Sequence, residues 1–142
     1  MSQSVLVLIK PDAVRRRLTG LILSEFEKRE LTIIDLKMMT SSRNRAEKHY
    51  ESLLGKPFFD EVVSYLSSGP LVAVILEGDN CIEIVRDLNG STDPRNADKC
   101  SIRGKYGISK TQNTVHASDS PQSAEREIAL WFDGVTDGCQ VS

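Results

Sequence analysis

One histidine near the end of the chain has neighbours that suit chemistry on a phosphate group. His116 lies in the segment Asn113-Thr-Val-His116-Ala-Ser118-Asp119-Ser120, where small residues leave its imidazole accessible. A histidine acts as nucleophile or general base near neutral pH, because its unperturbed pKa is about 6.5. A single histidine is more often a surface or structural residue, so the catalytic interpretation depends on whether phosphate-binding groups accompany it.

Three isolated basic residues stand near the ends of predicted elements. Lys10 closes an apolar run, Arg86 comes late in a predicted helix, and Arg103 lies in a polar stretch. Phosphates favour arginine for bidentate contacts and lysine as a point charge. Taken one by one, these residues are typical of solvated charges. Lys10 is the strongest candidate, because a lysine that ends a buried strand before Pro11-Asp12 is unusually placed for solubility alone.

Two other groups could contact a nucleotide. Thr92-Asp93-Pro94 and Ser101-Ile102-Arg103-Gly104 place hydroxyls beside arginine and glycine, which suits an anion, although turn chemistry explains the same residues equally well. Lys56-Pro57-Phe58-Phe59 offers an aromatic ring on which a base could stack for about 1–3 kcal/mol. Adjacent helix positions point about 100° apart, so the two phenylalanines cannot be equally buried.

Apolar periodicity predicts the elements that must position these residues. Strands are predicted at 4–10, 31–40, 71–76 and 114–117, and helices at 18–30, 42–50, 57–66, 79–88 and 120–132. Thr19, Ser42, Asp79 and Ser120 are the predicted helix caps. The strand at 31–40 alternates, with Ile34, Leu36 and Met38 on one side, which predicts that it is half-buried.

The periodicity stops between residues 89 and 112, where the chain is polar. A structureless stretch of this length in a small domain is uncommon and usually functional. The order of elements predicts an α+β fold: a ferredoxin-like βαββαβ sandwich, with a four-stranded antiparallel sheet covered by helices and a long active-site loop. A single domain is expected over residues 1–142, with a loose tail from about 133.

The composition limits the possible functions. The 142 residues are 39% hydrophobic and 27% charged, which is ordinary for a globular protein, and the net charge of −2 disfavours a general nucleic-acid binder. The three cysteines (Cys81, Cys100 and Cys139) have no paired spacing, so free thiols in a reducing compartment are expected. With two histidines and no Cys/His cluster, no permanent transition-metal site is expected. The first residues lack the features of a signal peptide, so a cytoplasmic location is expected.

Taken together, the motifs resemble those of nucleoside diphosphate kinases over residues 4–132. The Asn-x-x-His-Ala-Ser-Asp element is highly specific, and the ordered set is more so. The resemblance is carried by Lys10-Pro11-Asp12, His49-Tyr50, Lys56-Pro57-Phe58-Phe59, Ser68-Gly69-Pro70, Glu77-Gly78, Thr92-Asp93-Pro94, Ile102-Arg103-Gly104, the segment from Asn113 to Ser120 and Glu127-Ile-Ala-Leu-Trp131-Phe132.

The resemblance implies transfer of the γ-phosphate of a nucleoside triphosphate to a nucleoside diphosphate, with broad base specificity. The reaction would be ping-pong, through a phosphohistidine on the pros nitrogen of His116, although the sequence itself does not distinguish the two ring nitrogens. Mg²⁺ is the implied cofactor, bound chiefly through nucleotide phosphates. The implied partners are nucleoside tri- and diphosphates and further copies of the chain, as a hexamer in preference to a tetramer, with no membrane and no specific nucleic acid.

The resemblance also assigns roles to particular residues. The implied catalytic residues are the nucleophile His116, with Lys10 and Tyr50 beside it and Ser118 and Glu127 positioning it. The implied nucleotide-binding residues are Lys10, Phe58, Arg86, Thr92, Arg103 and Asn113. No metal ligand is assigned to the protein.

Several positions depart from the family pattern. Asp93 replaces an asparagine, Lys105 replaces an aspartate, and Lys99-Cys100-Ser101 stands where Pro-Gly-Thr is common. Lys110 stands where an aliphatic residue helps Phe58 to hold the base, and we expect its methylene stem to cover the base instead. These changes put the conformation of the loop and the nucleotide affinity in question, but they remove no reacting group.

Two alternatives belong to other functional classes. The chain could be an inactive nucleotide-sensing or nucleic-acid-binding relative, or a structural domain that only forms oligomers. Neither needs His116 together with Lys10, Arg86, Arg103, Asn113 and Glu127, so the retained set favours the enzyme.

Overall fold

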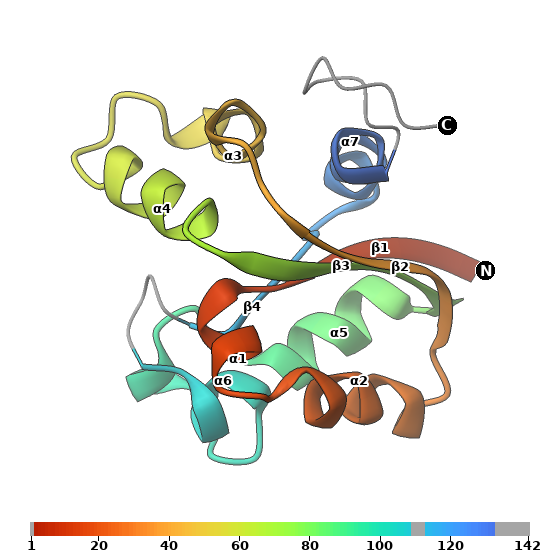
Figure 1. Cartoon of the computed structure of the whole chain (residues 1–142). Helices are drawn as coiled ribbons and strands as arrows, with labels where there is room; N and C mark the ends of the chain where they lie inside the picture. Colours follow the sequence, from red (N-terminus) through yellow and green to blue (C-terminus); the bar gives the residue numbers. More distant parts are fainter. Residues whose placement is uncertain (1, 109–112, 133–142) are drawn as a thin grey trace.

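The sheet has four strands in the order β2-β3-β1-β4, and every neighbouring pair is antiparallel. A computed structural model describes residues 2–108 and 113–132 (Figure 1). The strands are β1 (Ser2–Ile9), β2 (Thr32–Thr40), β3 (Pro70–Asp79) and β4 (Val115–Ala117). The order of strands confirms the predicted α+β plan of the ferredoxin-like type.

Helices cover both faces of this sheet (Figure 1). One face is covered by α1 (Pro11–Arg15), α2 (Thr19–Lys28), α5 (Cys81–Asn89) and α6 (Ile102–Tyr106). The other face is covered by α3 (Arg43–His49), α4 (Phe59–Leu66) and α7 (Pro121–Phe132). Two short 3-10 turns, η1 (Glu51–Leu53) and η2 (Pro94–Asn96), complete the described elements. No helix in the described ranges is both long and apolar enough to cross a lipid bilayer.

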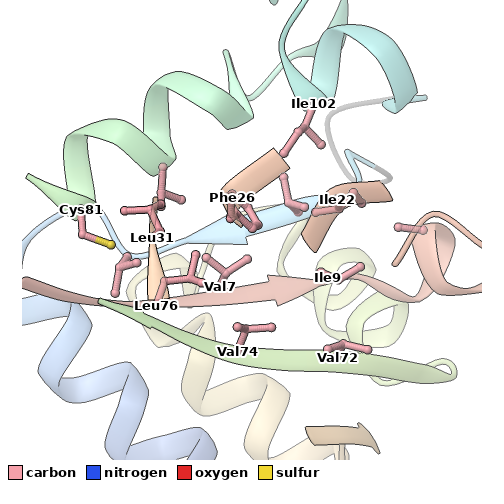
Figure 2. Packing of buried hydrophobic residues seen from close by; sticks show 14 of the residues in the cluster. Val7, Ile9, Ile22, Phe26, Leu31, Val72, Val74, Leu76, Cys81 and Ile102 are labelled. Atoms are coloured by element: carbon pink, nitrogen blue, oxygen red, sulfur yellow. The ribbon is translucent and has the colours of Figure 1, made fainter. Parts of the chain in front are cut away.

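The central strand β1 is buried on both faces, because successive side chains point to opposite sides of a sheet. Val5, Val7 and Ile9 belong to the core under α2, α5 and α6, part of which Figure 2 shows around Phe26. Leu6 and Leu8 belong to the core on the other face of the sheet. The residue that follows β1 is therefore held at the end of the most enclosed strand of the protein.

The alternating strand β2 differs from the prediction. Its apolar side is the exposed one: Ile34, Leu36 and Met38 have 49%, 44% and 60% of their surface accessible. An irregularity in the β2–β3 register falls between Ile33 and Asp35. β2 pairs with β3 along one edge only, and its other edge meets no strand of the described chain.

Two of the four predicted helix caps are correct, and two are wrong. Ser42 and Ser120 do accept backbone N–H groups, from Arg45 and Ser123. Thr19 instead lies inside α2, and Asp79 ends β3, so that Asn80 in the left-handed region begins α5. The polar stretch predicted to be structureless contains η2 and α6, which local side-chain caps stabilise.

Candidate active site

His116 is fixed on one ring nitrogen and open on the other. It lies on β4 opposite Leu8 of β1, and its Nε2 is 2.9 Å from Oε1 of Glu127 on α7. The Ser118 hydroxyl donates to the same carboxylate oxygen at 2.8 Å and accepts the backbone N–H of Leu6 at 3.2 Å. Because a carboxylate only accepts hydrogen bonds, Nε2 carries the proton and Nδ1 keeps its lone pair. Nδ1 has no hydrogen-bond partner in the described residues.

Three of the predicted binding residues form one hydrogen-bonded chain. Lys10, directly after β1, donates from Nζ to Oδ1 of Asn113 at 2.8 Å, and the Asn113 amide donates to the carbonyl of Thr92 at 3.1 Å. Lys10 and Asn113 are buried, with 6% and 2% of their surface accessible. These two hydrogen bonds connect the residue after β1 to Thr92, near the start of the polar stretch, and to Asn113, directly after its end.

Arg103 is oriented by the backbone around it. Ser101 caps α6 by accepting the N–H of Gly104 at 3.0 Å, which places Arg103 in the first turn of this helix. The guanidinium donates to the carbonyls of Gly90 at 2.8 Å and Val115 at 2.7 Å. Burial lowers its pKa to about 10, so it remains a cation at neutral pH.

Two other pKa values are shifted strongly beside these residues. Burial, together with the positive charge of Arg103, lowers the pKa of Lys10 to about 7. Burial raises the pKa of the Tyr50 hydroxyl well above its usual range, so Tyr50 stays a hydrogen-bond donor. An anion in this cleft would stabilise the protonated Lys10, because an opposite charge favours the charged form.

Most of the sequence-predicted residues line one open cleft, with Ser118 and Glu127 behind His116 on its far side. The cleft-lining members are Lys10, Tyr50, Phe58, Arg86, Thr92, Arg103, Asn113 and His116. Phe58 is 45% exposed at the cleft, whereas Phe59 packs against the core. This difference confirms that the two rings are not equally deep. Lys110, the residue expected to cover the base, lies outside the described residues.

Three of the residues that depart from the family pattern, Asp93, Ser101 and Lys105, make local contacts in the loop. The Asp93 carboxylate accepts the backbone N–H of Arg95 and receives its guanidinium at 3.1 and 2.8 Å. Lys105 donates to Glu25 of α2 at 2.8 Å. Ser101 supplies the cap of α6 described above. These contacts give the substituted residues local roles in holding the loop.

The sequence reasoning did not place two residues, His49 and Trp131, beside His116. His49, at the end of α3, is 4% exposed, and its ring centroid lies 4.4 Å from that of His116. Trp131 of α7 donates from Nε1 to Nδ1 of His49 at 3.1 Å. The only signal in the sequence was the adjacency of His49 and Tyr50, since nothing in the spacing places an α3 residue beside β4.

His49, His116 and Glu127 form the one described group of three residues with potential metal ligands close together, within 4.8 Å of one another. Its hydrogen bonds argue against a metal. The Trp131 N–H occupies the lone pair of His49 Nδ1, so the proton of a neutral ring is on Nε2. Neither nitrogen of His49 then offers a lone pair to a cation.

The arrangement suits phosphoryl transfer. His116 has an unpaired ring nitrogen and lines a cleft that also presents Lys10, Arg86, Arg103 and Thr92. Phosphoryl transfer depends mainly on positioning and on stabilising charge. The fold and the site together define a phosphotransferase.

Comparisons with known proteins agree. The family model described as nucleoside diphosphate kinase matches residues 3–136. A nucleoside diphosphate kinase of Saccharolobus solfataricus is 50% identical over 133 residues, which cover 94% of this chain and 96% of that protein. One from Methanosphaera stadtmanae is 51% identical, covering 94% of this chain and 88% of that protein.

Solved structures give the same result. The nucleoside diphosphate kinase of Encephalitozoon cuniculi superposes with a TM-score of 0.91 at 37% identity, covering 99% of this chain and 94% of that one. A halophilic nucleoside diphosphate kinase from Halobacterium salinarum in complex with CDP also gives 0.91, at 38% identity, over 96% of this chain and 91% of that one. The chain therefore belongs to the nucleoside diphosphate kinase family, whose members are phosphotransferases that act on nucleotides.

Proposed function

We propose that this chain transfers the γ-phosphate of a nucleoside triphosphate to a nucleoside diphosphate through a phosphohistidine on Nδ1, the pros nitrogen, of His116. The observation that carries the proposal is the pairing of Nε2 with Glu127, which leaves Nδ1 as the nitrogen with a free lone pair. The reaction is ping-pong, because one cleft serves the donor and the acceptor in turn.

In the first half-reaction the Nδ1 lone pair attacks the γ-phosphorus, and the bond from that phosphorus to the β,γ-bridging oxygen breaks. The diphosphate leaves with the electrons of that bond. The imidazole gains positive charge as the N–P bond forms, and Glu127 stabilises this charge through Nε2–H. In the second half-reaction a terminal oxygen of the incoming diphosphate attacks the same phosphorus, the N–P bond breaks, and neutral His116 is regenerated.

The cationic residues of the cleft act on the phosphates. Arg103 and Arg86 offer guanidinium groups, and Lys10 is a point charge held by Asn113. Tyr50 donates from a hydroxyl that stays protonated. We assign Thr92 to the phosphates and Asn113, with Lys10, to the ribose, as the family resemblance implies.

The substrate enters as its Mg²⁺ complex. The residues assigned to the phosphates, Lys10, Arg86, Thr92 and Arg103, are cations and a hydroxyl, and the Glu127 carboxylate is paired with His116. The nucleotide phosphates therefore hold the ion. Phe58 would stack on the base at the cleft mouth, and stacking with few contacts to base edges makes the site tolerant of the base. The CDP complex of the Halobacterium salinarum relative is consistent with a nucleotide in this cleft.

The exposed apolar side of β2 supports self-association. Ile34, Leu36 and Met38 stand on a strand whose outer edge meets no other strand of the described chain, which is where a second copy would bury them. We propose a homo-oligomer, a hexamer in preference to a tetramer. Sedimentation velocity on the wild type and on Leu36→Glu tests this, with a smaller species expected for the variant. A wild type that sediments as a monomer would exclude any oligomer.

We further propose that residues 1–142 work as one catalytic domain in the cytoplasm. The free thiols of the buried Cys81 and the exposed Cys100 are consistent with a reducing compartment. Fractionation of the source cells tests this location, and recovery of the protein outside the cytoplasm would exclude it.

The catalytic proposal is tested by isolating the phosphoenzyme. The protein is incubated with Mg²⁺ and ATP labelled at the γ-phosphate, freed of nucleotide, and examined for label that is acid-labile and base-stable. GDP is then added, and labelled GTP is sought. Label that is present in the wild type, absent in His116→Ala and passed to GDP is the expected result. A wild type that binds ADP but takes no label would mean an inactive nucleotide-binding relative.

A further inference from the structure

Asp12 is a buried acidic residue close to the phosphate end of the cleft. It lies two positions after Lys10, in the first turn of α1, and only 1% of its surface is accessible. Burial raises the pKa of its carboxyl, whereas the positive charges of Lys10 and Arg16 oppose that rise and favour the carboxylate. The reaction proposed above makes no use of Asp12, although a buried carboxylate is costly unless it is paired.

Tyr65 of α4 is the hydrogen-bond partner of Asp12. Its hydroxyl donates to Oδ1 of Asp12 and accepts the backbone N–H of the same residue at 2.7 Å. This N–H lies at the start of a helix, where the first amides have no acceptor within the helix. One hydroxyl therefore satisfies both the buried carboxyl and an orphan amide of α1. These two hydrogen bonds fix α4 against the first turn of α1.

Lys10 belongs to the same turn as Asp12. It is the N-cap residue of α1, and its carbonyl accepts the N–H groups of Ala13 at 3.0 Å and Val14 at 3.1 Å. Its Nζ is held by Asn113. The backbone of one helical turn therefore sets the position of Asp12 relative to the lysine that we assign to the phosphates.

Tyr65 shares a rigid helix with Phe58, which directly precedes α4. The two residues are seven positions apart. At about 3.6 residues per turn they lie on the same face of the helix, about 10 Å apart along its axis. Val62, between them on this face, also lines the cleft, whereas Val63 and Leu66 belong to the core. The face of α4 that presents the ring for the base therefore also presents the hydroxyl that contacts α1.

Asp12 also has a neighbour that leads to the other wall of the cleft. Its Oδ2 lies 3.9 Å from Nη1 of Arg16, and the same nitrogen donates to the carbonyl of Tyr106 at the end of α6. α6 is the helix that carries Arg103. The first turn of α1 is thus in contact with both the helix on the base side and the helix on the phosphate side.

We propose that Tyr65 and Asp12 are positioning residues that hold Phe58 and Lys10 at a fixed separation, so that one nucleotide contacts both at once. The base and the phosphates are covalently linked, so affinity gains from both contacts only where their spacing matches the ligand. This role rests on the proposed nucleotide site and deepens it, because it makes the cleft selective for a phosphate group that carries a base. Neither Tyr65 nor Asp12 lines the cleft itself.

Tyr65→Phe tests this role, because it keeps the ring and the Asp12 carboxyl but removes both hydrogen bonds. Tyr106→Phe is the matched control: it removes a tyrosine hydroxyl that forms no hydrogen bond within residues 2–108 and 113–132. Phe26→Leu, in the core under α2, controls for a general loss of stability. Calorimetry measures the affinity of each protein for ADP, which carries a base, and for pyrophosphate, which has none.

Tyr65→Phe is expected to bind ADP roughly 3- to 10-fold more weakly, a part of the loss that removal of a stacking ring causes. Its affinity for pyrophosphate should change by less than about twofold, because the phosphate-binding residues keep their own hydrogen bonds. Both controls should bind both ligands as the wild type does. An unchanged affinity for ADP, or an equal loss of affinity for ADP and pyrophosphate, would overturn the proposal.

A double-mutant cycle with Phe58→Ala tests whether the effect passes through the base. In the Phe58→Ala background, Tyr65→Phe should weaken ADP binding by less than about twofold, because no ring remains to be positioned. Equal effects of Tyr65→Phe in both backgrounds would contradict the proposal. Unaltered ADP binding by Phe58→Ala would overturn it together with the proposed base site. A wild type that binds ADP but takes no label refutes only the phosphohistidine.

The wild type alone provides a further test, because coupling between two equilibria is reciprocal. If the contact between Tyr65 and Asp12 favours ADP, then ADP must favour the contact. Hydrogen exchange of the Asp12 amide reports the contact, since the Tyr65 hydroxyl is its acceptor. At equal saturation, ADP should slow this exchange roughly 3- to 10-fold relative to amides of β1, and pyrophosphate by less than about twofold. Equal slowing by the two ligands would overturn the proposal even if Tyr65→Phe did not fold.

Discussion

Lys10 and Asn113, 103 positions apart in the chain, are joined by a hydrogen bond of 2.8 Å between Nζ and Oδ1. The partner of the buried ammonium is thus a neutral amide. Burial and Arg103 lower the Lys10 pKa to about 7, so near neutral pH this position is partly uncharged until an anion arrives. We therefore expect Lys10 to take up a proton when a nucleotide binds in the cleft.

We predict that binding of ADP takes up about one proton at pH 8. Free Lys10 is mostly neutral at that pH, and the phosphates raise its pKa so that it becomes charged. Calorimetry in buffers with different ionisation enthalpies measures the uptake, which should decline below pH 7 and disappear in Lys10→Gln. Equal heats in all buffers at pH 8 would contradict the prediction.

The same lysine should also make stability depend on pH. Its pKa is about 7 in the folded chain, against 10.5 for an unperturbed lysine, so the unfolded state binds more protons between these values. The stability of the wild type relative to Lys10→Met should therefore be lowest below pH 7 and rise toward pH 10.5. Urea unfolding of both proteins at several pH values measures this difference. A constant difference would mean that Lys10 titrates alike in both states.

We predict that Phe58 and Phe59 differ in function: loss of the first ring weakens nucleotide binding, and loss of the second lowers stability. Phe58→Ala should raise the KM of every nucleotide by roughly 10- to 100-fold, because it removes the exposed ring on which bases stack, with a small effect on stability. Phe59→Ala should instead destabilise the fold, since Phe59 packs against the core, and leave KM almost unchanged. Steady-state kinetics with ATP, GTP, CTP and UTP, together with thermal unfolding, separate these outcomes. A base-dependent effect of Phe58→Ala would argue against simple stacking.

Most of the cleft-lining residues that the sequence identified belong to short motifs with fixed spacing. The sequence did not place His49 beside His116, because that position depends on contacts between α3, β4 and α7 that no local pattern encodes. The alternation of Ile34, Leu36 and Met38 correctly indicated a strand, but periodicity cannot distinguish an apolar side that faces the core from one that is exposed.

Hydrophobic periodicity also failed to predict structure in the polar stretch after α5. Its lack of apolar period suggested no structure, yet η2 and α6 form there, because hydroxyl and carboxylate caps stabilise elements of three to five residues. Such elements are too short for a hydrophobic period to be visible in the sequence.

Asn89 lies in the inward-facing stripe of α5 with Ile82 and Val85, and is 1% exposed. Neither atom of its carboxamide has a hydrogen-bond partner in residues 2–108 and 113–132. We predict that Asn89→Leu, a change of similar shape, stabilises the fold by about 1–2 kcal/mol, because an unpaired buried polar group is costly. Urea unfolding at pH 7 measures the gain. A loss of stability would indicate that Asn89 has a bound water as its partner.

Arg95 should protect the phosphate site from the negative charge of Asp93. The two side chains form a bidentate contact beside Thr92, at a position where the family resemblance implies a neutral asparagine. Arg95→Ala is predicted to raise the KM for ADP by roughly 2- to 5-fold at low salt, and less at high salt, because removal of this cation lets the negative charge of Asp93 act more strongly on the phosphates. Asp93→Asn combined with Arg95→Ala should return KM to the wild-type value. If Arg95→Ala and the double variant share the same raised KM, Arg95 itself binds the nucleotide and does not act through Asp93.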